Sequence, residues 1–452
     1  MKLKICCIVT ILMLIIPTAS AVNLNKTDDV STANSWSNLD LSADIVDLIN
    51  QVNESLVYYY LKGLVDIGSR YTGSDNCKKA AQYIYDEFKK IGLDVYFDEW
   101  KYIRFQGKNV VATLKGTDPS SDAVFIICAH YDTITYPLYI PKKNCTNVGA
   151  DNDGSGIAAI LAIASILCKY HFNHTIRFIA TSGEEVGAYG SYTYAKRAYG
   201  RNENIIAVLD VDMIGYANTT EGGRILKIIE SERTEWISSF SNDVCQRYTE
   251  YIDLTVKPVP HISQDQQGFL DFGYDAVMYT ESDNYPFLMT RDSIDKINFT
   301  YFVKATKFLL AIAAELANKP IDVQVRIVTP CAGCFYLFDH KIFRLPGFNL
   351  WRTDLNGMTY IIGRNNKIRV NISTDEEIKD VYFCIDSEQI MVDHKMPPYE
   401  CKIERFFKPA IGKHTISVQV TTASGKTAYD EMDICIVAFS CFWFRILPRR
   451  EI

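Results

Sequence analysis

Positive charge, long apolar runs and histidine are all scarce in this 452-residue chain. Lys and Arg number 47 against 54 Asp and Glu, which gives a formal net charge of −7, and no basic cluster offsets it. This balance argues against nucleic acid as a partner. The apolar stretches Ile5–Ile16 and Phe439–Phe444 are shorter than the roughly 20 residues that a membrane-spanning helix needs. The chain has only seven histidines, so any imidazole ligand for a metal must come from a small set.

The N-terminus has the pattern of an export signal. Lys2 and Lys4 precede the apolar stretch, and the small residues at 19 and 21 suit cleavage after Ala21. We therefore expect residues 1–21 to be a signal peptide. The mature protein is then expected to be secreted or extracytoplasmic, with no membrane span after cleavage of the signal.

The cysteines offer little chemistry of their own. Cys6 and Cys7 would leave with the signal, so 11 of the 13 cysteines remain, and at least one thiol is unpaired or pairs outside the chain. The pair in Cys331-Ala332-Gly333-Cys334 has the spacing of half a zinc ribbon, but no second pair follows at ribbon spacing. A local disulfide or an ordinary turn is the better interpretation, and we assign no metal there.

Strand and helix patterns alternate through the first two thirds of the chain. Helical spacing predicts one helix from Ala43 to about Leu64 and a second over Lys78–Ile91, stopped by Gly92. Further elements are predicted as strands at Ala123–Cys128, Thr175–Ala180 and Asn204–Val211 and as helices at Gly154–Tyr170 and Glu185–Tyr199. This alternation predicts an α/β domain over residues 43–319, with a mostly parallel sheet covered by helices on both faces.

A different pattern follows the apolar helix predicted over Phe302–Asn318. From Val323 onward the helical periodicity disappears, and short alternating runs separated by turn residues replace it. They predict a small all-β, immunoglobulin-like sandwich over residues 323–438, followed by a tail at 439–452. At the other end, residues 22–42 are rich in Asn, Asp, Ser and Thr and are predicted to be a flexible leader.

Acidic and imidazole side chains occur at the ends of the predicted strands and in one Gly- and Asp-rich loop. These candidate residues are His130, Asp151, Glu184, Glu185 and Asp212. The carboxyl ends of strands in such a sheet meet at one edge, where ligands gather. Imidazole and carboxylate are the ligand types that suit zinc. The sequence therefore predicts a zinc centre of one or two ions at this edge.

The candidate ligands can be given roles from the needs of a two-ion centre. Asp151 suits the bridge between two ions, because its loop can turn sharply. His130 and Asp212 would complete one ion, and Glu185 would bind the other. Asp132, two residues beyond His130, could hold the other nitrogen of the imidazole.

Glu184 is the candidate catalytic base. Its side chain points differently from that of Glu185, so one carboxylate can coordinate while the other faces the metal-activated water. Glu184 would take a proton from that water and deliver it to the leaving amine. The predicted reaction is hydrolysis of a bond in a peptide or protein substrate.

These motifs resemble the M28 family of zinc peptidases, whose members include secreted aminopeptidases. The motifs are His130-Tyr131-Asp132, Gly149-Ala150-Asp151-Asn152-Asp153-Gly154-Ser155-Gly156, Ser182-Gly183-Glu184-Glu185, Asp212-Met213-Ile214-Gly215 and Gly68-Ser69-Arg70-Tyr71-Thr72-Gly73. The resemblance covers residues 55–318 and implies a three-layer α/β/α, phosphorylase/hydrolase-like fold. It implies the same roles, with Asp151 bridging two zinc ions and Glu184 as the base. We therefore expect an exported zinc peptidase, most specifically an aminopeptidase.

One family ligand is missing. The family ends its set with a His in a His-Thr-x-x-Asp-Thr stretch, and the counterpart here falls at Leu288 or Met289, neither of which suits zinc. His261 and the Gln264/Gln266 region are candidate substitutes. Three alternatives therefore stay open: a single-zinc enzyme, a glutaminyl-cyclase-like enzyme, and a catalytically impaired binding protein. In the last, the β-sandwich would provide cell-surface contact.

Overall fold

A computed structural model describes most of the chain from residue 41 onward. The described ranges are 41–102, 104–134, 147–260, 264–283, 285–286, 291–331, 334–337, 340–344, 359–362, 367–393, 397–402 and 412–437. The predicted signal peptide, all but the end of the predicted leader, and the C-terminal tail lie outside these ranges. Within them, no helix combines the length and the apolar character needed to cross a bilayer.

An eight-stranded sheet forms the centre of the first domain, with the strand order β1-β2-β4-β3-β5-β8-β6-β7. The strands are β1 Asp94–Tyr102, β2 Phe105–Leu114, β3 Val124–His130, β4 Thr175–Thr181, β5 Ile205–Val211, β6 Ile225–Glu230, β7 Thr255–Pro260 and β8 Ala276–Glu281. Neighbours from β4 through β3 and β5 to β8 run parallel. Every residue of β3 and β5 is buried, as expected for parallel strands covered on both faces.

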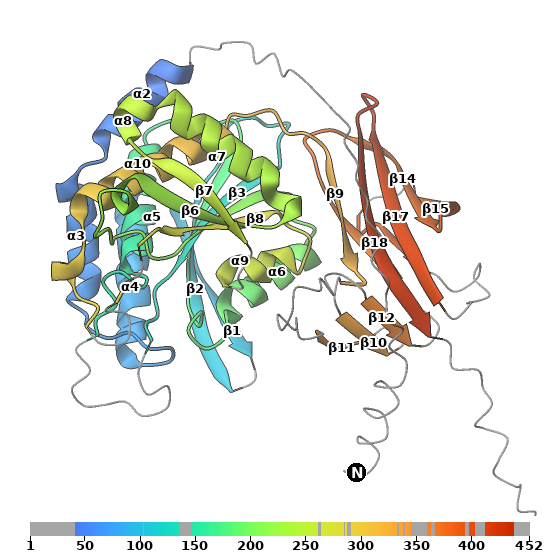
Figure 1. The fold of residues 1–452 in the computed structure, drawn as a ribbon, viewed down its shortest axis with the longest axis horizontal. Coiled ribbons are helices and arrows are strands. Elements are labelled where there is room, and N and C mark those ends of the chain that lie inside the picture. The colour runs from blue at the N-terminus through green and yellow to red at the C-terminus, as the bar shows by residue number, and fades with distance from the viewer. Residues whose placement is uncertain are drawn as a thin grey trace, which may run out of the picture. The chain divides into compact units, whose positions relative to one another are not determined.

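Helices cover both faces of this sheet (Figure 1). The α-helices are α2 Leu41–Gln51, α3 Glu54–Val65, α4 Asp75–Ile91, α5 Gly154–Leu167, α6 Tyr189–Gly200, α7 Glu235–Arg247, α8 Thr249–Ile252, α9 Asp265–Leu270 and α10 Phe299–Leu316, and the short 3₁₀ helices are η1 Gly222–Arg224, η2 Glu232–Thr234 and η3 Ile294–Lys296. On one face, α3, α4, α5 and α10 contribute to the larger apolar core. On the other face, α6 and α9 pack over a separate core. The predicted three-layer α/β/α architecture is confirmed.

Two helix predictions need correction. The helix predicted from Ala43 to Leu64 is two helices, because the Asn53 side chain accepts a hydrogen bond from the Leu56 amide at 3.1 Å and starts α3 afresh. The helix predicted from Glu185 starts only at Tyr189. Before it, the amides of residues 187 and 188 both donate to the Glu184 carbonyl at 2.9 Å, which closes a tight turn. That turn carries the two glutamates of interest.

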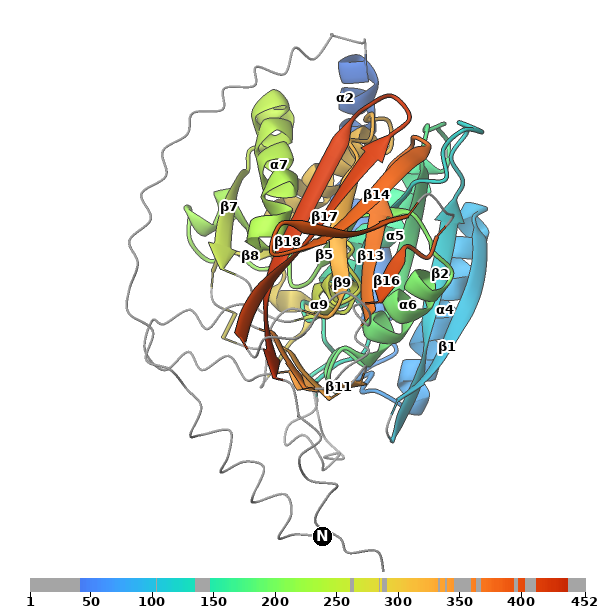
Figure 2. The ribbon, with the colours of Figure 1, turned by 90° about the vertical axis from the view of Figure 1, so that its right-hand side faces the viewer.

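The second part of the chain is all β, as predicted. It contains a seven-stranded sheet in the order β11-β10-β12-β18-β17-β14-β15 and a three-stranded sheet in the order β16-β13-β9. The strands are β9 Gln324–Thr329, β10 Cys334–Leu337, β11 His340–Arg344, β12 Thr359–Ile362, β13 Lys367–Ser373, β14 Ile378–Ile385, β15 Glu388–Asp393, β16 Glu400–Lys402, β17 Gly412–Thr422 and β18 Thr427–Val437. Figure 2 shows β17 and β18 as long neighbouring strands. Inward-facing side chains from both sheets share one apolar core, whereas kinship with immunoglobulin domains stays a prediction.

Cys331 and Cys334 lie in position to form a disulfide. Their Sγ atoms are 2.8 Å apart, and both residues are buried. The backbone of Cys331 is fixed on both sides, because its amide donates to Tyr336 Oη at 3.0 Å and its carbonyl accepts from Thr359 Oγ1 at 2.8 Å. Fixed thiols at this distance favour local pairing over pairing with another chain.

We expect protein purified without reductant to contain the Cys331–Cys334 disulfide. Alkylation in denaturant followed by peptide mapping should then leave both residues unmodified until a reductant is added. Cys334→Ser should make Cys331 available to the alkylating reagent, which provides the matched control. Alkylation of both cysteines in the unreduced wild-type protein would contradict the prediction.

Candidate metal centre

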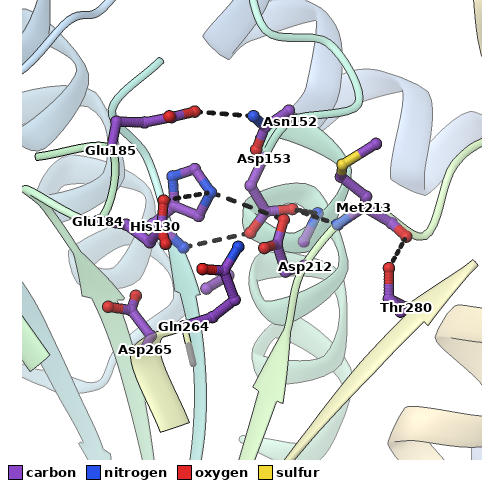
Figure 3. A network of polar contacts seen from close by, with 12 residues as sticks. His130, Asn152, Asp153, Glu184, Glu185, Asp212, Met213, Gln264, Asp265 and Thr280 are labelled. Atoms are coloured by element: carbon purple, nitrogen blue, oxygen red, sulfur yellow. Dashed lines mark hydrogen bonds and ion pairs between the residues drawn. The ribbon is translucent and has the colours of Figure 1, made fainter. Parts of the chain in front are cut away.

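The candidate residues converge at the carboxyl edge of the parallel strands. His130 is the last residue of β3 and stands opposite Thr181, the last residue of β4, in the parallel register. The Glu184 turn follows β4, and Asp212 follows β5 directly. The structure brings His130, Glu184, Glu185 and Asp212 together in one cluster, in which His130 and Asp212 are buried and the two glutamates are half-buried (Figure 3).

His130 has a defined orientation and one unused ring nitrogen. The imidazole is 2 % exposed, and Nδ1 lies 3.0 Å from the backbone carbonyl of Asp132. Nδ1 must therefore carry a hydrogen, so Nε2 is the ring nitrogen whose lone pair can serve a metal once any proton on it is displaced. Nε2 is 3.6 Å from Asp212 Oδ1, and neither atom has a hydrogen-bond partner among the described residues. Two buried acceptors that face each other in this way need a cation or a proton between them.

Carboxylates crowd around this single imidazole. Glu184 Oε2 lies 3.9 Å from His130 Nε2, and ligand atoms of His130, Glu184 and Glu185 lie within 4.8 Å of one another. Although burial opposes protonation, the neighbouring carboxylates of Asp132, Asp212 and Glu184 raise the pKa of His130 well above its usual value. Burial raises the pKa of Glu184 well above its ordinary range and that of Glu185 to about 7. This excess of buried negative charge fits a bound divalent cation.

Asp151 does not enter the cluster, and its neighbour Asp153 does. Asp151 Oδ1 instead accepts from the Gly215 amide at 2.8 Å and from Ser155 Oγ at 3.0 Å. Ligand atoms of Asp153, His130 and Asp212 lie within 4.8 Å of one another. The carboxylate of Asp153 also accepts from three backbone amides, those of residues 130, 156 and 213. A carboxylate has about four lone-pair sites, so one remains for an ion. The geometry therefore gives no support to Asp151 as the bridge.

Asp132 connects the His130 strand to the Glu184 turn. Its backbone carbonyl, rather than its carboxylate, takes the hydrogen bond from the imidazole, and its Oδ1 lies 3.7 Å from Nδ1. Oδ1 accepts from the amides of Gly183 and Glu184 at 2.9 and 3.3 Å, and Oδ2 accepts from Thr72 Oγ1 at 2.6 Å. The buried carboxylate thus holds the candidate base beside the imidazole.

Two further residues hold the loop that carries Asp151, Asn152 and Asp153, and neither was singled out in the sequence. Arg70 is fully buried and donates to the carbonyls of residues 131, 148 and 149. Asp292 accepts from the amides of Asp151 and Asn152, both at 2.9 Å. Arg70 belongs to the Gly68–Gly73 motif, so the sequence did indicate that it could matter. Nothing near Asp292 in the sequence indicates that it contacts this loop.

Only some of the residues considered for the missing histidine, either its counterparts or its substitutes, lie in the described part of the chain. Leu288, Met289 and His261 lie outside the described residues. Gln264 is described, and Figure 3 shows its side-chain amide directed into the cluster beside Asp212. Gln266 is buried, and its Oε1 accepts from the Gln264 amide at 3.1 Å, so it fixes Gln264 rather than facing an ion itself.

A second pair of acids lies beside the cluster and predicts a pH effect on stability. Asp151 Oδ2 and Glu281 Oε1 are both buried, without a hydrogen-bond partner among the described residues. Burial, with the nearby Asp292 carboxylate, raises the pKa of Asp151 to about 7. A carboxyl group with a raised folded-state pKa stabilises the fold while it is protonated. That stabilisation is fully present below the unfolded pKa of about 4 and is lost as the pH rises through about 7.

We therefore expect the free energy of unfolding of the metal-free protein to fall between about pH 4 and pH 7. Asp151→Asn should reduce this fall by an amount on the order of 1–4 kcal/mol, because the amide stays neutral and can donate to Glu281. Urea unfolding at several pH values measures the difference, with the exposed Asp243→Asn as the control. An unchanged pH dependence in Asp151→Asn would argue against a raised pKa at this position.

This fold and cluster define an α/β protein with a metal-ligand site at the carboxyl edge of its sheet. Residues 109–313 match the sequence model of peptidase family M28. The match places the α/β domain among the hydrolases and implies zinc as the metal.

Curated relatives agree with this assignment, and a solved structure shares the fold. The chain is 30% identical over 263 residues to a "Probable zinc metalloprotease" of Pyricularia oryzae, covering 49% of this chain and 51% of that protein, so it spans about half of that relative's length. It is 24% identical over 301 residues to "Leucine aminopeptidase 1" of Sclerotinia sclerotiorum, covering 61% of this chain and 75% of that protein. The structure of the LapA aminopeptidase of Legionella pneumophila is similar, with a TM-score of 0.56, 20% identity, and coverage of 67% of this chain and 81% of that one. At that identity the structural likeness shows the fold alone.

Proposed function

We propose that the protein is an exported zinc-dependent aminopeptidase that hydrolyses peptide bonds with Glu184 as the general base. The observation that carries this proposal is the pair of unsatisfied buried atoms, His130 Nε2 and Asp212 Oδ1, with Glu184 Oε2 close by. Such atoms suit a cation on one side of a reacting group and a proton acceptor on the other. The name of the Sclerotinia relative favours aminopeptidase polarity.

The residues present fit one zinc ion. His130 Nε2 and Asp212 Oδ1 would hold it, with Asp153 as the third ligand of the same group. When bound, zinc supplies Lewis-acid polarisation of the scissile carbonyl and lowers the pKa of water. Glu185, the predicted ligand of a second ion, lies on the far side of the cluster next to Asn152.

The remaining chemistry belongs to the protein. Glu184 would accept the proton of the attacking water and pass it to the leaving amine. Its side chain is 9 % exposed, so a substrate entering the site would exclude most of the remaining solvent from it. Asp132 would keep the base in place through the hydrogen bonds to the amides of the Glu184 turn.

The wider assignments rest on the sequence. We propose a signal peptide at residues 1–21, a leader at 22–42, the peptidase domain at 43–319 and a β domain at 323–438 that contacts the cell surface. The substrates would be peptides or proteins outside the cytoplasm. The glutaminyl-cyclase-like alternative stays a prediction, because the family fold is compatible with both chemistries.

A binding protein without catalysis is the second candidate. It is favoured by one observation, the neutral amide of Asn152 beside Glu185 in a cluster otherwise built from acids. Such a protein would keep peptide affinity and lose turnover.

Fluorogenic aminoacyl amides separate these candidates. An aminopeptidase should release the fluorophore from substrates with a free α-amine and not from their N-acetylated counterparts. A chelator should abolish the release, and added zinc should restore it. No release from either substrate set by the zinc-loaded protein would reject the peptidase and leave the binding protein.

A further inference from the structure

The cluster has one imidazole lone pair and two sets of acids that could share it. One set combines His130 with Asp153 and Asp212, and the other combines it with Glu184 and Glu185. Nδ1 is engaged by the Asp132 carbonyl, so Nε2 is the only ring atom that can bind an ion. A single lone pair serves a single ion, and the closest acid oxygen to Nε2 is Asp212 Oδ1 at 3.6 Å, against 3.9 Å for Glu184. The set of His130, Asp153 and Asp212 is therefore the position that we expect to hold the ion.

The other side of the cluster is closed by Asn152. Its Nδ2 donates to Glu185 Oε1 at 2.7 Å. The residue is 8 % exposed, and Asp292 accepts from its backbone amide at 2.9 Å, which fixes the backbone that carries this side chain. Figure 3 shows Asn152 and Glu185 facing each other on one side of the cluster, with His130 and Asp212 on the other. A second ion bridged to the first would have to occupy this region.

An amide is a poor group for that position. Two divalent ions about 3.5–4 Å apart repel each other and need a shared anionic ligand between them. Asn152 is neutral, and its donated hydrogens carry partial positive charge toward Glu185. Of the two carboxylates in this loop, Asp153 groups with His130 and Asp212, and Asp151 directs its Oδ1 toward Gly215 and Ser155. Among the described residues, neither loop carboxylate groups with Glu184 and Glu185.

We propose that the centre binds a single zinc ion through His130, Asp153 and Asp212, and that Asn152 excludes a second ion by holding Glu185 with an uncharged amide. This proposal rests on the proposed zinc-dependent function and adds the number of ions and the residue that sets it. Asn152→Asp would place a carboxylate between the two positions and convert the site into a two-ion centre.

Zinc stoichiometry tests the proposal directly. The full chain is stripped with EDTA, titrated with zinc chloride by calorimetry, and its zinc measured by mass spectrometry after gel filtration. We expect about one ion per chain for the wild type and about two for Asn152→Asp, because only the variant has a bridging carboxylate. Asn202→Asp adds the same charge at an exposed turn and should stay at about one ion.

A further variant tests whether Glu185 contributes to zinc binding. Glu185→Gln should leave the wild-type count at about one ion and change the zinc affinity less than about tenfold, because Glu185 is bound to Asn152 and not to the ion. Loss of zinc in Glu185→Gln would overturn the assignment of the occupied position. This measurement remains decisive if Asn152→Asp does not fold, which circular dichroism would show.

The outcomes distinguish this proposal from the proposed function. Two zinc ions in an active wild-type protein would overturn the single-ion centre and leave the peptidase standing. One ion in a protein without hydrolysis would support the single-ion centre and reject the peptidase. An Asn152→Asp variant that folds and still binds one ion would reject Asn152 as the excluding residue.

Discussion

Replacing Glu184 by Gln is expected to lower kcat by roughly 10²–10⁴-fold, the usual contribution of a positioned general base. The amide has nearly the same size and shape as the carboxylate, so packing against the His130 cluster should persist. It cannot accept the proton of the attacking water, and it cannot return one to the leaving amine. Because Glu184 is not among the three ligands assigned to zinc, the zinc content should stay at the wild-type level.

The measurement is steady-state hydrolysis of an aminoacyl amide, with zinc determined on the same protein samples. A loss in kcat at unchanged KM would indicate that Glu184 acts in the transition state and not in substrate binding. Glu250→Gln, at an exposed site on α8, makes the same change of charge away from the cluster and should be fully active. Equal product release by wild type and Glu184→Gln would refute the role of Glu184 as base.

The placement of the site was predictable because it follows from the layout of the sheet. Strands such as β3 and β5 are continuous apolar runs, since parallel strands are buried on both faces. Their carboxyl ends must meet at one edge, so a polar residue at each end identifies the edge. His130 and Asp212 were found in this way, and the structure brings them to 3.6 Å.

The choice among neighbouring residues in the loop was not predictable in the same way. Asp151, Asn152 and Asp153 are consecutive, and which of them faces the imidazole depends on the local backbone path. That path is fixed by Asp292, 141 positions away from Asp151, and by the buried guanidinium of Arg70. Residue spacing does not reveal contacts between residues so far apart in the sequence. The neighbouring sequence therefore could not show whether Asp151 is the bridging residue.

The segment between β5 and α10 shows a second limit. No strand was predicted there, yet β6, β7 and β8 complete the sheet. β7 contains Pro258 and Pro260, which removes two backbone donors and weakens any strand pattern. It is tolerated because β7 is the edge strand, where one side of the backbone needs no partner in the sheet. Edge position is a property of the assembled sheet and not of the sequence window.

Replacing His130 by Gln is expected to weaken zinc binding by more than about 100-fold, because even the loss of a residue that only supports a ligand costs about 10–100-fold. The imidazole is the only nitrogen ligand in the assigned set, and its Nε2 has no other partner among the described residues. Hydrolysis should be lost together with the metal. Competition with a chelating dye measures the affinity without relying on activity.

His174→Gln is the matched control, since His174 is also buried but lies just before β4, at the opposite end of that strand from the cluster. Its two ring nitrogens are engaged by Ser121 Oγ at 2.7 Å and the Lys319 carbonyl at 2.9 Å, so its loss should leave zinc binding intact.

The pH dependence of zinc affinity gives an independent test of His130 as a ligand. The neighbouring acids raise the pKa of His130 well above its usual value, so zinc must displace a proton from Nε2 in the wild type. Zinc affinity should therefore rise with pH in the wild type and in His174→Gln, and rise less steeply in His130→Gln. Unchanged affinity and an unchanged slope in His130→Gln would mean that the ion binds elsewhere.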